Sequence, residues 1–199
     1  FSHLIAVSPA LKARYPRAAL IPNGIAVPPC RSAAGPTIAF VGRFSEEKGP
    51  LDFVALARGM PDERFVAFGD GPLLREARQT PPPNLELRGP VPSMDPHWDG
   101  LGLLVMPSRF EGLPMAALEA MARGIPVAAY AVGALPELLG DGCGFLAEPG
   151  DPESLSDAVD RWTRLSDAER NALAGELRAR IAERYSIDAC AGATIDLYR

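Results

Sequence analysis

One stretch organises this chain: Ser108-Arg109-Phe110-Glu111-Gly112-Leu113-Pro114-Met115-Ala116-Ala117-Leu118-Glu119-Ala120-Met121-Ala122. The apolar run just before it, Leu103-Leu104-Val105-Met106, is typical of a buried parallel strand. The second half of the stretch consists of strong helix formers, and Pro114 stands where a first helical residue would. The predicted order is therefore strand, tight loop and helix.

Two carboxylates, Glu111 and Glu119, flank the junction between this loop and helix. A helix N-terminus attracts phosphate through its free N–H groups. A carboxylate inside the same helix could reach a sugar hydroxyl beside that phosphate, a geometry that suits a nucleotide-sugar. A paired-carboxylate hydrolase site is an alternative. Glu119 stands in an apolar helical segment, where an unpaired charge would be costly, and this favours a functional role for it.

Strands and helices alternate through the rest of the chain. Strands are predicted at 37–41, 64–68, 85–87, 103–106, 126–130 and 144–146, most of them rich in apolar residues, with helical segments between them. The alternation predicts an α/β fold, one parallel sheet with helices on both faces. Ligands in such folds bind at the carboxyl ends of the strands, where the loops at Gly42, Gly69, Gly89, Ser108 and Gly133 lie.

The two ends of the chain have a different pattern. A short strand at 2–7, a helix capped by Ser8 and a second apolar run at 18–21 precede a linker rich in Pro, Gly and Ser at 28–36. Three helices are predicted after residue 150, the second opened by a capping box at Ser166 and Glu169. Met94 to Gly100 is expected to form a short helix.

Composition excludes several classes of protein. The net charge of −5 gives no support for binding to nucleic acid or to an anionic membrane. Cys30, Cys143 and Cys190 show neither a disulfide nor a metal-ligand spacing, which indicates a reducing compartment, the cytoplasm. We expect no metal and treat His3 and His97 as structural. Cys143 is expected to be a small buried thiol rather than a reactive one.

The loop after the strand at 37–41 carries Gly42, Arg43 and Lys48, the last being one of only two lysines in the chain. An Arg and a Lys that converge on a diphosphate would neutralise its charge without a metal. The alternative is a solvated loop, since Glu46 and Glu47 stand between them. A second loop at Gly69 could approach phosphate through backbone N–H groups, although tight turns need glycine in any case.

Taken together, these motifs resemble the C-terminal domain of a GT-B-fold glycosyltransferase, most similar to the large retaining family 4. The stretches that carry the resemblance run in the family's order: Ile21-Pro22-Asn23-Gly24-Ile25, Phe40-Val41-Gly42-Arg43, Lys48-Gly49, Gly69-Asp70-Gly71-Pro72, Gly89-Pro90-Val91, Pro107-Ser108 to Ala122, Gly124-Ile125-Pro126-Val127 and Gly133-Ala134-Leu135-Pro136-Glu137. One departure is Ala26, where the family often carries Asp.

The resemblance implies a Rossmann-like domain that binds a nucleotide-diphosphate-sugar donor without a metal or other cofactor. Arg43 and Lys48 resemble the diphosphate-binding pair, and Glu111 resembles the glutamate near the donor sugar; these three are the expected catalytic residues. Glu119 resembles the ribose ligand. Backbone groups complete the expected binding set: Gly42, Gly69, Val91, Gly112, Leu113, Met115 and Ala116.

The resemblance also implies a division of the chain. Residues 1–30 resemble the end of an N-terminal acceptor domain and its linker, 31–185 the donor-binding domain, and 186–199 the helix that crosses back. Because the chain starts at Phe1 and most of the acceptor domain is missing, we expect a fragment that binds donor, does not transfer sugar and can self-associate. Peripheral membrane association of the full-length enzyme is compatible with the family.

Two other functions remain open at this point. A non-hydrolysing nucleotide-sugar epimerase shares the architecture but should place a His in the cleft, for which His97 is a poor candidate. A nucleotide-binding module without catalysis would keep the same site. The base, the sugar and the acceptor are not determined by these residues.

Overall fold

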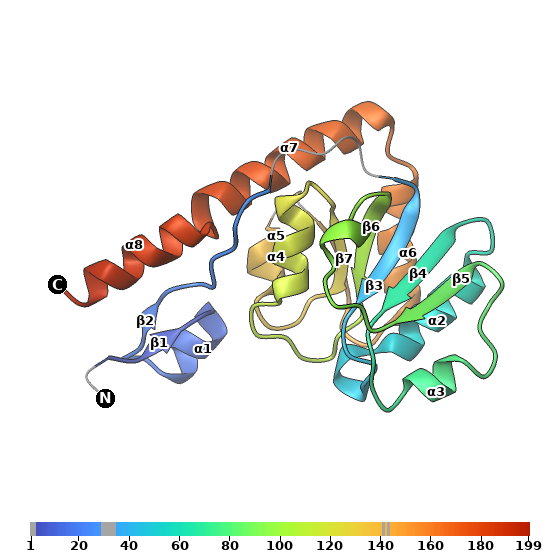
Figure 1. The fold of residues 1–199 in the computed structure, drawn as a ribbon, viewed down its shortest axis with the longest axis horizontal. Coiled ribbons are helices and arrows are strands. Elements are labelled where there is room, and N and C mark those ends of the chain that lie inside the picture. Colours follow the sequence, from blue (N-terminus) through green and yellow to red (C-terminus); the bar gives the residue numbers. More distant parts are fainter. Residues whose placement is uncertain (1–2, 29–34, 141, 143) are drawn as a thin grey trace.

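The computed structural model describes residues 3–28, 35–140, 142 and 144–199. Cys30, Cys143 and most of the predicted linker therefore lie outside the described residues. The main body is a parallel six-stranded sheet in the order β5-β4-β3-β6-β7-β8 (Figure 1). Its strands are β3 (Thr37–Val41), β4 (Arg64–Phe68), β5 (Leu85–Gly89), β6 (Leu101–Met106), β7 (Val127–Tyr130) and β8 (Phe145–Ala147). The predicted α/β fold is confirmed.

Helices cover both faces of this sheet (Figure 1). One face packs against α4 (Met115–Ala122), α5 (Leu135–Leu139) and α7 (Asp167–Arg184), the other against α2 (Pro50–Gly59), α3 (Leu74–Ala77) and α6 (Pro152–Thr163). Alternation along the strands feeds the two cores: Ala39 points to the first face, while Ile38 and Phe40 point to the second. Burial on both faces explains why the central strands β3, β6 and β7 are continuous apolar runs, whereas the edge strand β5 carries Glu86 and Arg88.

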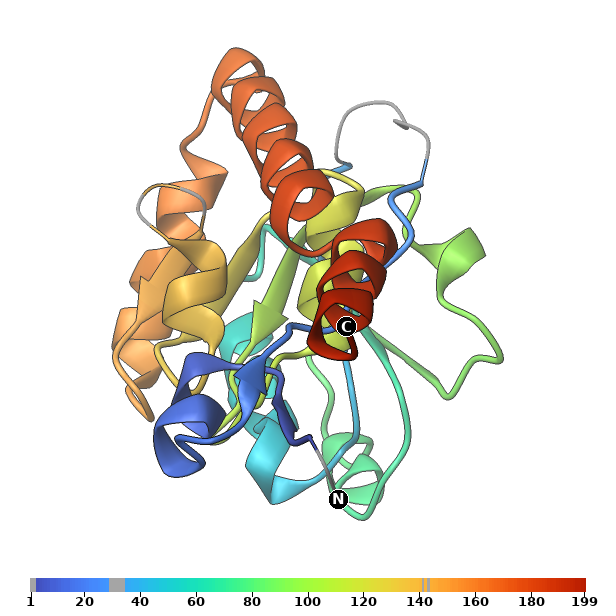
Figure 2. The same cartoon turned by 90° about the vertical axis from the view of Figure 1, so that its left-hand side faces the viewer.

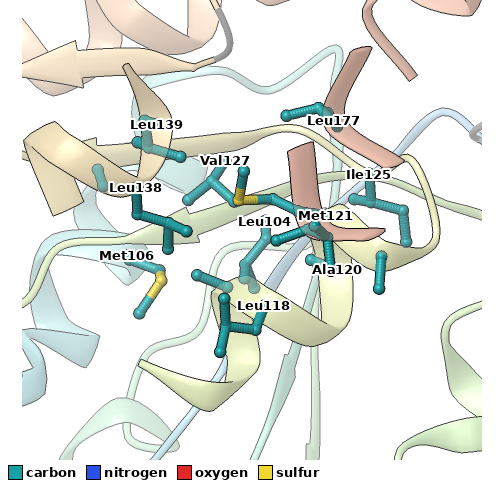
Figure 3. Packing of buried hydrophobic residues seen from close by; sticks show 14 of the residues in the cluster. Leu104, Met106, Leu118, Ala120, Met121, Ile125, Val127, Leu138, Leu139 and Leu177 are labelled. Carbon is teal, nitrogen blue, oxygen red and sulfur yellow. The ribbon is translucent and has the colours of Figure 1, made fainter. Parts of the chain in front are cut away.

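The helix α4 lies at the centre of the first core. Figure 3 shows Leu118 and Met121 among Leu104 of β6, Val127 of β7 and side chains of α5 and α7. Leu118 and Met121 are fully buried. This packing holds α4 on one face of the sheet, and its N-terminus, which follows β6, lies at the carboxyl edge where ligands bind in such folds.

Two local predictions need correction. Pro114 is the N-cap of α4 rather than its first helical residue, because its ψ of 122° is extended while its carbonyl accepts the N–H of Leu118. Met94 to Gly100 forms only the short 3-10 helix η2 (Asp95–His97). Pro96 has no N–H to donate, and Gly100 adopts a φ of +84° that ends any helix.

The helix caps read from the sequence are confirmed. The Ser166 hydroxyl accepts the N–H of Glu169, and the Glu169 carboxylate accepts the N–H of Ser166 at 2.8 Å. The hydroxyl of Ser8 caps α1 (Pro9–Arg14) by accepting the N–H of Leu11. These bonds satisfy N–H groups that a helix start leaves unpaired.

A small unit stands beside the main sheet. The strands β1 (Ile5–Ala6) and β2 (Ala19–Leu20) pair in parallel across α1. Figures 1 and 2 place this unit and α8 (Ile187–Leu197) on the same side of the molecule. Ile25 joins this side to the main body, because its N–H donates to the carbonyl of Tyr185 and its carbonyl accepts the N–H of Ile187.

The structure contains no helix, within its described residues, that combines the length and apolar character needed to cross a bilayer. Over the same residues the cysteine present, Cys190, forms no disulfide.

Candidate nucleotide-sugar site

Three neighbouring pockets follow the carboxyl ends of β3, β4, β5 and β6. The inner pocket, about 170 Å³, is lined by Phe40, Val41, Gly42, Lys48, Val105, Met106, Ser108, Glu111, Pro114, Met115 and Ala116. The middle pocket, about 250 Å³, is lined by Val41, Gly42, Arg43, Phe68, Gly69, Asp70, Pro90, Val91 and Met94. The outer pocket, about 560 Å³, is lined by Ile25, Ala26, Pro28, Val91, Pro92, Ser93, Met94, Asp95, Glu119 and Arg123. Shared residues join the pockets in that order.

The inner pocket holds an ion pair. The Lys48 ammonium lies 2.7 Å from Oε1 of Glu111, whose side chain is only 4% exposed. The two loops that carry these residues are tied together, since the N–H of Arg109 donates to the carbonyl of Glu47 at 2.8 Å. The pair therefore presents a cation and a carboxylate in fixed positions beside the N-terminus of α4.

A glycine makes room for the Glu111 loop. Gly133 has a φ of +58°, and a Cβ at this position would lie 1.8 Å from the carbonyl oxygen of Glu111. No L side chain fits there without displacing the loop. The N–H of Ala134 also donates to the carbonyl of Gly112 at 3.2 Å. The loop after β7 thus supports the loop that carries the inner carboxylate.

Four residues of the expected backbone set lie at the start of α4 and in the loop before it. Met115 and Ala116 line the inner pocket, while Gly112 and Leu113 do not. Leu113 is 8% exposed and belongs to the first core. The side chain of Leu113 packs into the core, and the next residues that line the inner pocket are Pro114, Met115 and Ala116 at the start of α4.

Arg43 and Lys48 line different pockets. Arg43 is exposed at the middle pocket, beside Gly69. Gly69 has a φ of +132°, and a Cβ there would lie 1.8 Å from the carbonyl oxygen of Gly42. This close crossing of two loops brings the two pockets together at Gly42. A ligand that touches both cations must therefore extend across both pockets.

The outer pocket contains Glu119, which is half-buried. Its carboxylate has no hydrogen bond or ion pair with any side chain in the part of the chain that the structure describes. Desolvation raises the pKa of this carboxyl, the positive charge of Arg123 opposes the rise, and Asp95 adds to it. A partly desolvated acceptor without a partner is suited to hydroxyl donors from a ligand.

Sequence reasoning missed three polar residues of this pocket. Arg123 donates to Oδ1 of Asp95 at 2.6 Å, and Ser93 donates to the other carboxylate oxygen of Asp95 at 3.3 Å. Arg123 stands four positions after Glu119, a spacing that places both on one side of a helix and could have drawn attention to it. Its pairing with Asp95 joins distant segments and has no signal in the sequence. Ala26, noted only as a departure, also lines this pocket.

A fourth hollow, of about 790 Å³, begins at the starts of β3, β4 and β5 and extends to Phe68 and Arg88. It has His97 on its wall and shares Phe68 with the middle pocket. His97 packs against the ring of Phe68 at 5.2 Å and lines none of the three pockets described above. Charged residues of both signs, among them Asp62, Arg64 and Glu86, line this hollow. Size alone does not make it the ligand site.

A metal centre has no support in the described residues, among which no group of three His, Cys, Asp or Glu side chains could hold an ion. The polar groups of the pockets include the guanidinium of Arg43, the ammonium of Lys48 and the N–H groups at the start of α4, together with the carboxylates of Glu111 and Glu119. Such a set can bind an anion and hydroxyl groups on either side of it.

Comparison with known proteins shows the family to which the chain is related. The family model described as "Glycosyl transferases group 1" matches residues 35–164. The 2-deoxystreptamine N-acetyl-D-glucosaminyltransferase of Streptomyces fradiae is 37% identical over 155 residues, which cover 70% of this chain and 36% of that protein. The 2-deoxystreptamine glucosyltransferase of Streptomyces kanamyceticus is 35% identical over 82% of this chain and 45% of its own length. The chain thus spans less than half the length of these two relatives.

Solved structures share the fold. HepE of Anabaena, crystallised in complex with UDP, superposes with a TM-score of 0.84 at 19% identity, covering 99% of this chain and 63% of that one. TarM of S. aureus, crystallised with UDP among its ligands, gives a TM-score of 0.87 at 16% identity, covering all of this chain and 44% of that one. These likenesses extend over the small β1–α1–β2 unit and α8 as well as the main sheet.

Proposed function

Because the chain belongs to the glycosyl transferases group 1 family, we propose that it binds the nucleotide-diphosphate-sugar donor of a glycosyltransferase. The observation that carries the proposal is the row of three joined pockets at the carboxyl ends of the strands. Lys48, Arg43 and the start of α4 lie along the inner and middle pockets, with the carboxylate of Glu111 in the inner pocket and that of Glu119 in the outer one. A nucleotide-sugar carries its diphosphate between two rings that bear hydroxyl groups, an order that matches cations placed between two carboxylates.

The diphosphate fits between Arg43 and Lys48. Arg43 would contact it from the middle pocket and Lys48 from the inner one, beside the N–H groups of Met115 and Ala116. When the bond to the sugar breaks, negative charge grows on the departing diphosphate, and these groups stabilise it electrostatically. They supply there what a metal would supply, and the proposed transfer is therefore metal-independent.

Glu111 would act beside the donor sugar. Its carboxylate is held by Lys48, so that one oxygen is engaged and the other remains for a sugar hydroxyl. Glu119 would accept the ribose hydroxyls in the outer pocket, and the backbone around Val91 would meet the base. Transfer with retention of the anomeric configuration is what the resemblance to family 4 implies, and it is part of the proposal.

The acceptor is proposed to bind to a second domain. Two observations support this. The chain spans only 36% and 45% of the lengths of two relatives. In addition, α8 contains no buried residue and exposes the apolar side chains of Ile187 and Ile195. We assign residues 1–30 and 186–199 to the contact with that domain and 31–185 to donor binding. Alone, the chain would bind donor, transfer nothing and tend to self-associate.

We propose that the full-length enzyme acts in the cytoplasm. Peripheral association with a membrane is compatible with this location. An epimerase gains no support, since His97 lines the large hollow and none of the three joined pockets.

Titration calorimetry of the chain with UDP, GDP and ADP tests the proposal. We expect at least one of them to bind, and Glu119→Ala to weaken that binding about tenfold, which corresponds to about 1.4 kcal/mol. Glu176→Ala, on the exposed side of α7, is the matched control and should bind as wild type does. The proposal fails if none of the three nucleotides binds, or if both variants behave alike. Sugar transfer by the chain alone would overturn the assignment of the acceptor to a second domain.

A further inference from the structure

We propose that Arg123 is a positioning residue that anchors residues 91–98, the base-side wall of the outer pocket, to the C-terminal turn of α4. This inference rests on the proposed function, because it concerns how the pocket for the nucleoside is shaped. Residue 123 has no role in the function described so far and does not need to touch the ligand.

The side chain of Arg123 contacts three other residues. Its Nη1 donates to the carbonyl of Glu119 at 3.0 Å, and its Nη2 donates to Oδ1 of Asp95 at 2.6 Å. Its guanidinium carbon lies 5.5 Å from the ring centroid of Trp98. The first contact lies in α4, while the other two lie at either end of η2. The planar guanidinium can serve all three directions together, which the single ammonium of a lysine cannot.

The anchored segment forms much of the outer pocket. Val91, Ser93, Met94 and Asp95 all line it, and Val91 and Met94 also line the middle pocket. The segment itself has little regular structure, since η2 has only three residues. It therefore depends on side-chain contacts for its position, and the side chain of Arg123 is 12% exposed while that of Asp95 is 75% exposed. The partly buried arginine fixes an otherwise exposed loop.

Trp98 packs residues 91–98 against the core. Its side chain is 2% exposed and belongs to the first core. The N–H groups of His97 and Trp98 both donate to the carbonyl of Met94, which closes the turn. Arg123 covers the ring and holds Asp95 on the pocket side of this turn. Loss of the guanidinium would release the wall but leave Trp98 and the core in place.

The chain offers a matched control. Arg170 lies over the ring of Trp162 at 4.5 Å and donates to the carbonyl of Thr163 at 3.0 Å. This is the same kind of arginine–tryptophan contact, placed between α6 and α7 and away from the three pockets. Arg170→Met should remove similar contacts and lower the free energy of unfolding by a similar amount, without changing the outer pocket.

The test compares Arg123→Met, Arg123→Lys and Arg170→Met by calorimetry with two probes: the nucleoside diphosphate that wild type binds most tightly, and inorganic pyrophosphate. We expect Arg123→Met to weaken nucleoside diphosphate binding about tenfold and to change pyrophosphate binding less than about twofold, because Arg43 and Lys48 are untouched. Arg123→Lys should recover part of the loss. Arg170→Met should bind both probes as wild type does.

Three results would overturn the inference: wild-type binding by Arg123→Met, an equal loss for both probes, or an equal loss in Arg170→Met. Hydrogen exchange without ligand supplies a separate readout, in which amides of residues 91–98 exchange faster in Arg123→Met and unchanged exchange contradicts the anchor. If wild type binds none of the nucleotides, the proposed function fails, while hydrogen exchange still decides whether Arg123 anchors the segment.

Discussion

The inner and outer pockets hold their carboxylates in opposite ways. Glu111 is 5% exposed and paired with Lys48 at 2.7 Å, whereas Glu119 is half-buried and its carboxylate is unpartnered within the described residues. Both come from one stretch of sequence, but Glu111 lies in the loop before α4 and Glu119 lies within the helix, so they line different pockets. The difference separates two tasks: the inner pocket is a charge pair already arranged before ligand binds, and the outer pocket is an acceptor that a ligand completes.

Breaking the inner pair should have the largest effect on stability. Lys48→Met leaves the buried Glu111 without its counterion, and we expect the free energy of unfolding to fall by about 2 kcal/mol, less than for a fully buried pair because Lys48 is 30% exposed. Urea unfolding measures this loss. The double variant Lys48→Met/Glu111→Gln should recover part of it. Equal stability of Lys48→Met and wild type would show that the pair contributes nothing.

The next effect comes from the support beneath Glu111. Gly133→Ala places a Cβ 1.8 Å from the Glu111 carbonyl oxygen at a φ of +58°, so the loop must shift, at a cost of about 1–3 kcal/mol. Gly175→Ala is the control, because nothing lies within 4 Å of a Cβ there and the residue is inside α7. That control should gain about 0.5–1 kcal/mol. A Gly133→Ala variant as stable as wild type, and with unchanged pyrophosphate affinity, would contradict the described loop packing.

The smallest effect on stability concerns Glu119. Its pKa is raised in the folded chain by desolvation, so the folded state binds its proton more readily than the unfolded state does. The contribution of this carboxyl to stability is therefore present below the unfolded pKa of about 4.3 and is lost as pH rises through the raised folded value. Glu119→Gln should be slightly more stable than wild type at pH 7, and this advantage should disappear toward pH 4.

Ligand binding should show the opposite trend at the same residue. Ionised Glu119 accepts hydroxyl protons, so nucleotide affinity in wild type should fall as pH decreases toward the ordinary glutamate range, provided the proposed ribose contact exists. Glu119→Gln should bind more weakly at pH 7 and lose this part of the pH dependence. Calorimetry at several pH values compares the affinities of wild type and Glu119→Gln. Parallel pH profiles of the two proteins would show that Glu119 does not contact the nucleotide.

Much of the fold follows from local patterns. The strand β3 coincides with its apolar run, and the capping box at Ser166 marks the start of α7 as predicted. The errors arise where local signals compete with packing. Pro114 was expected as the first helical residue but caps α4 from outside the helix. The side chain of Leu113 completes the core, and the contact expected from its N–H stays a prediction.

The site could be predicted only in part. Strand ends and loops indicate that Gly42, Gly69 and Glu111 lie at one edge of the sheet, because parallel strands share one carboxyl edge. The contacts between them are not local: Lys48 and Glu111 are 63 positions apart, and Asp95 and Arg123 are 28 apart. No periodicity encodes such pairs, and they emerge only when the loops are packed together.

A crystal structure of the chain with the nucleoside diphosphate that binds best tests the central claim most directly. The account predicts that the nucleotide lies along the three joined pockets, with its diphosphate between Arg43 and Lys48 at the start of α4 and its ribose hydroxyls on Glu119. A nucleotide bound instead in the large hollow at the starts of β3, β4 and β5, or a row of pockets that stays empty at saturating ligand, would contradict it.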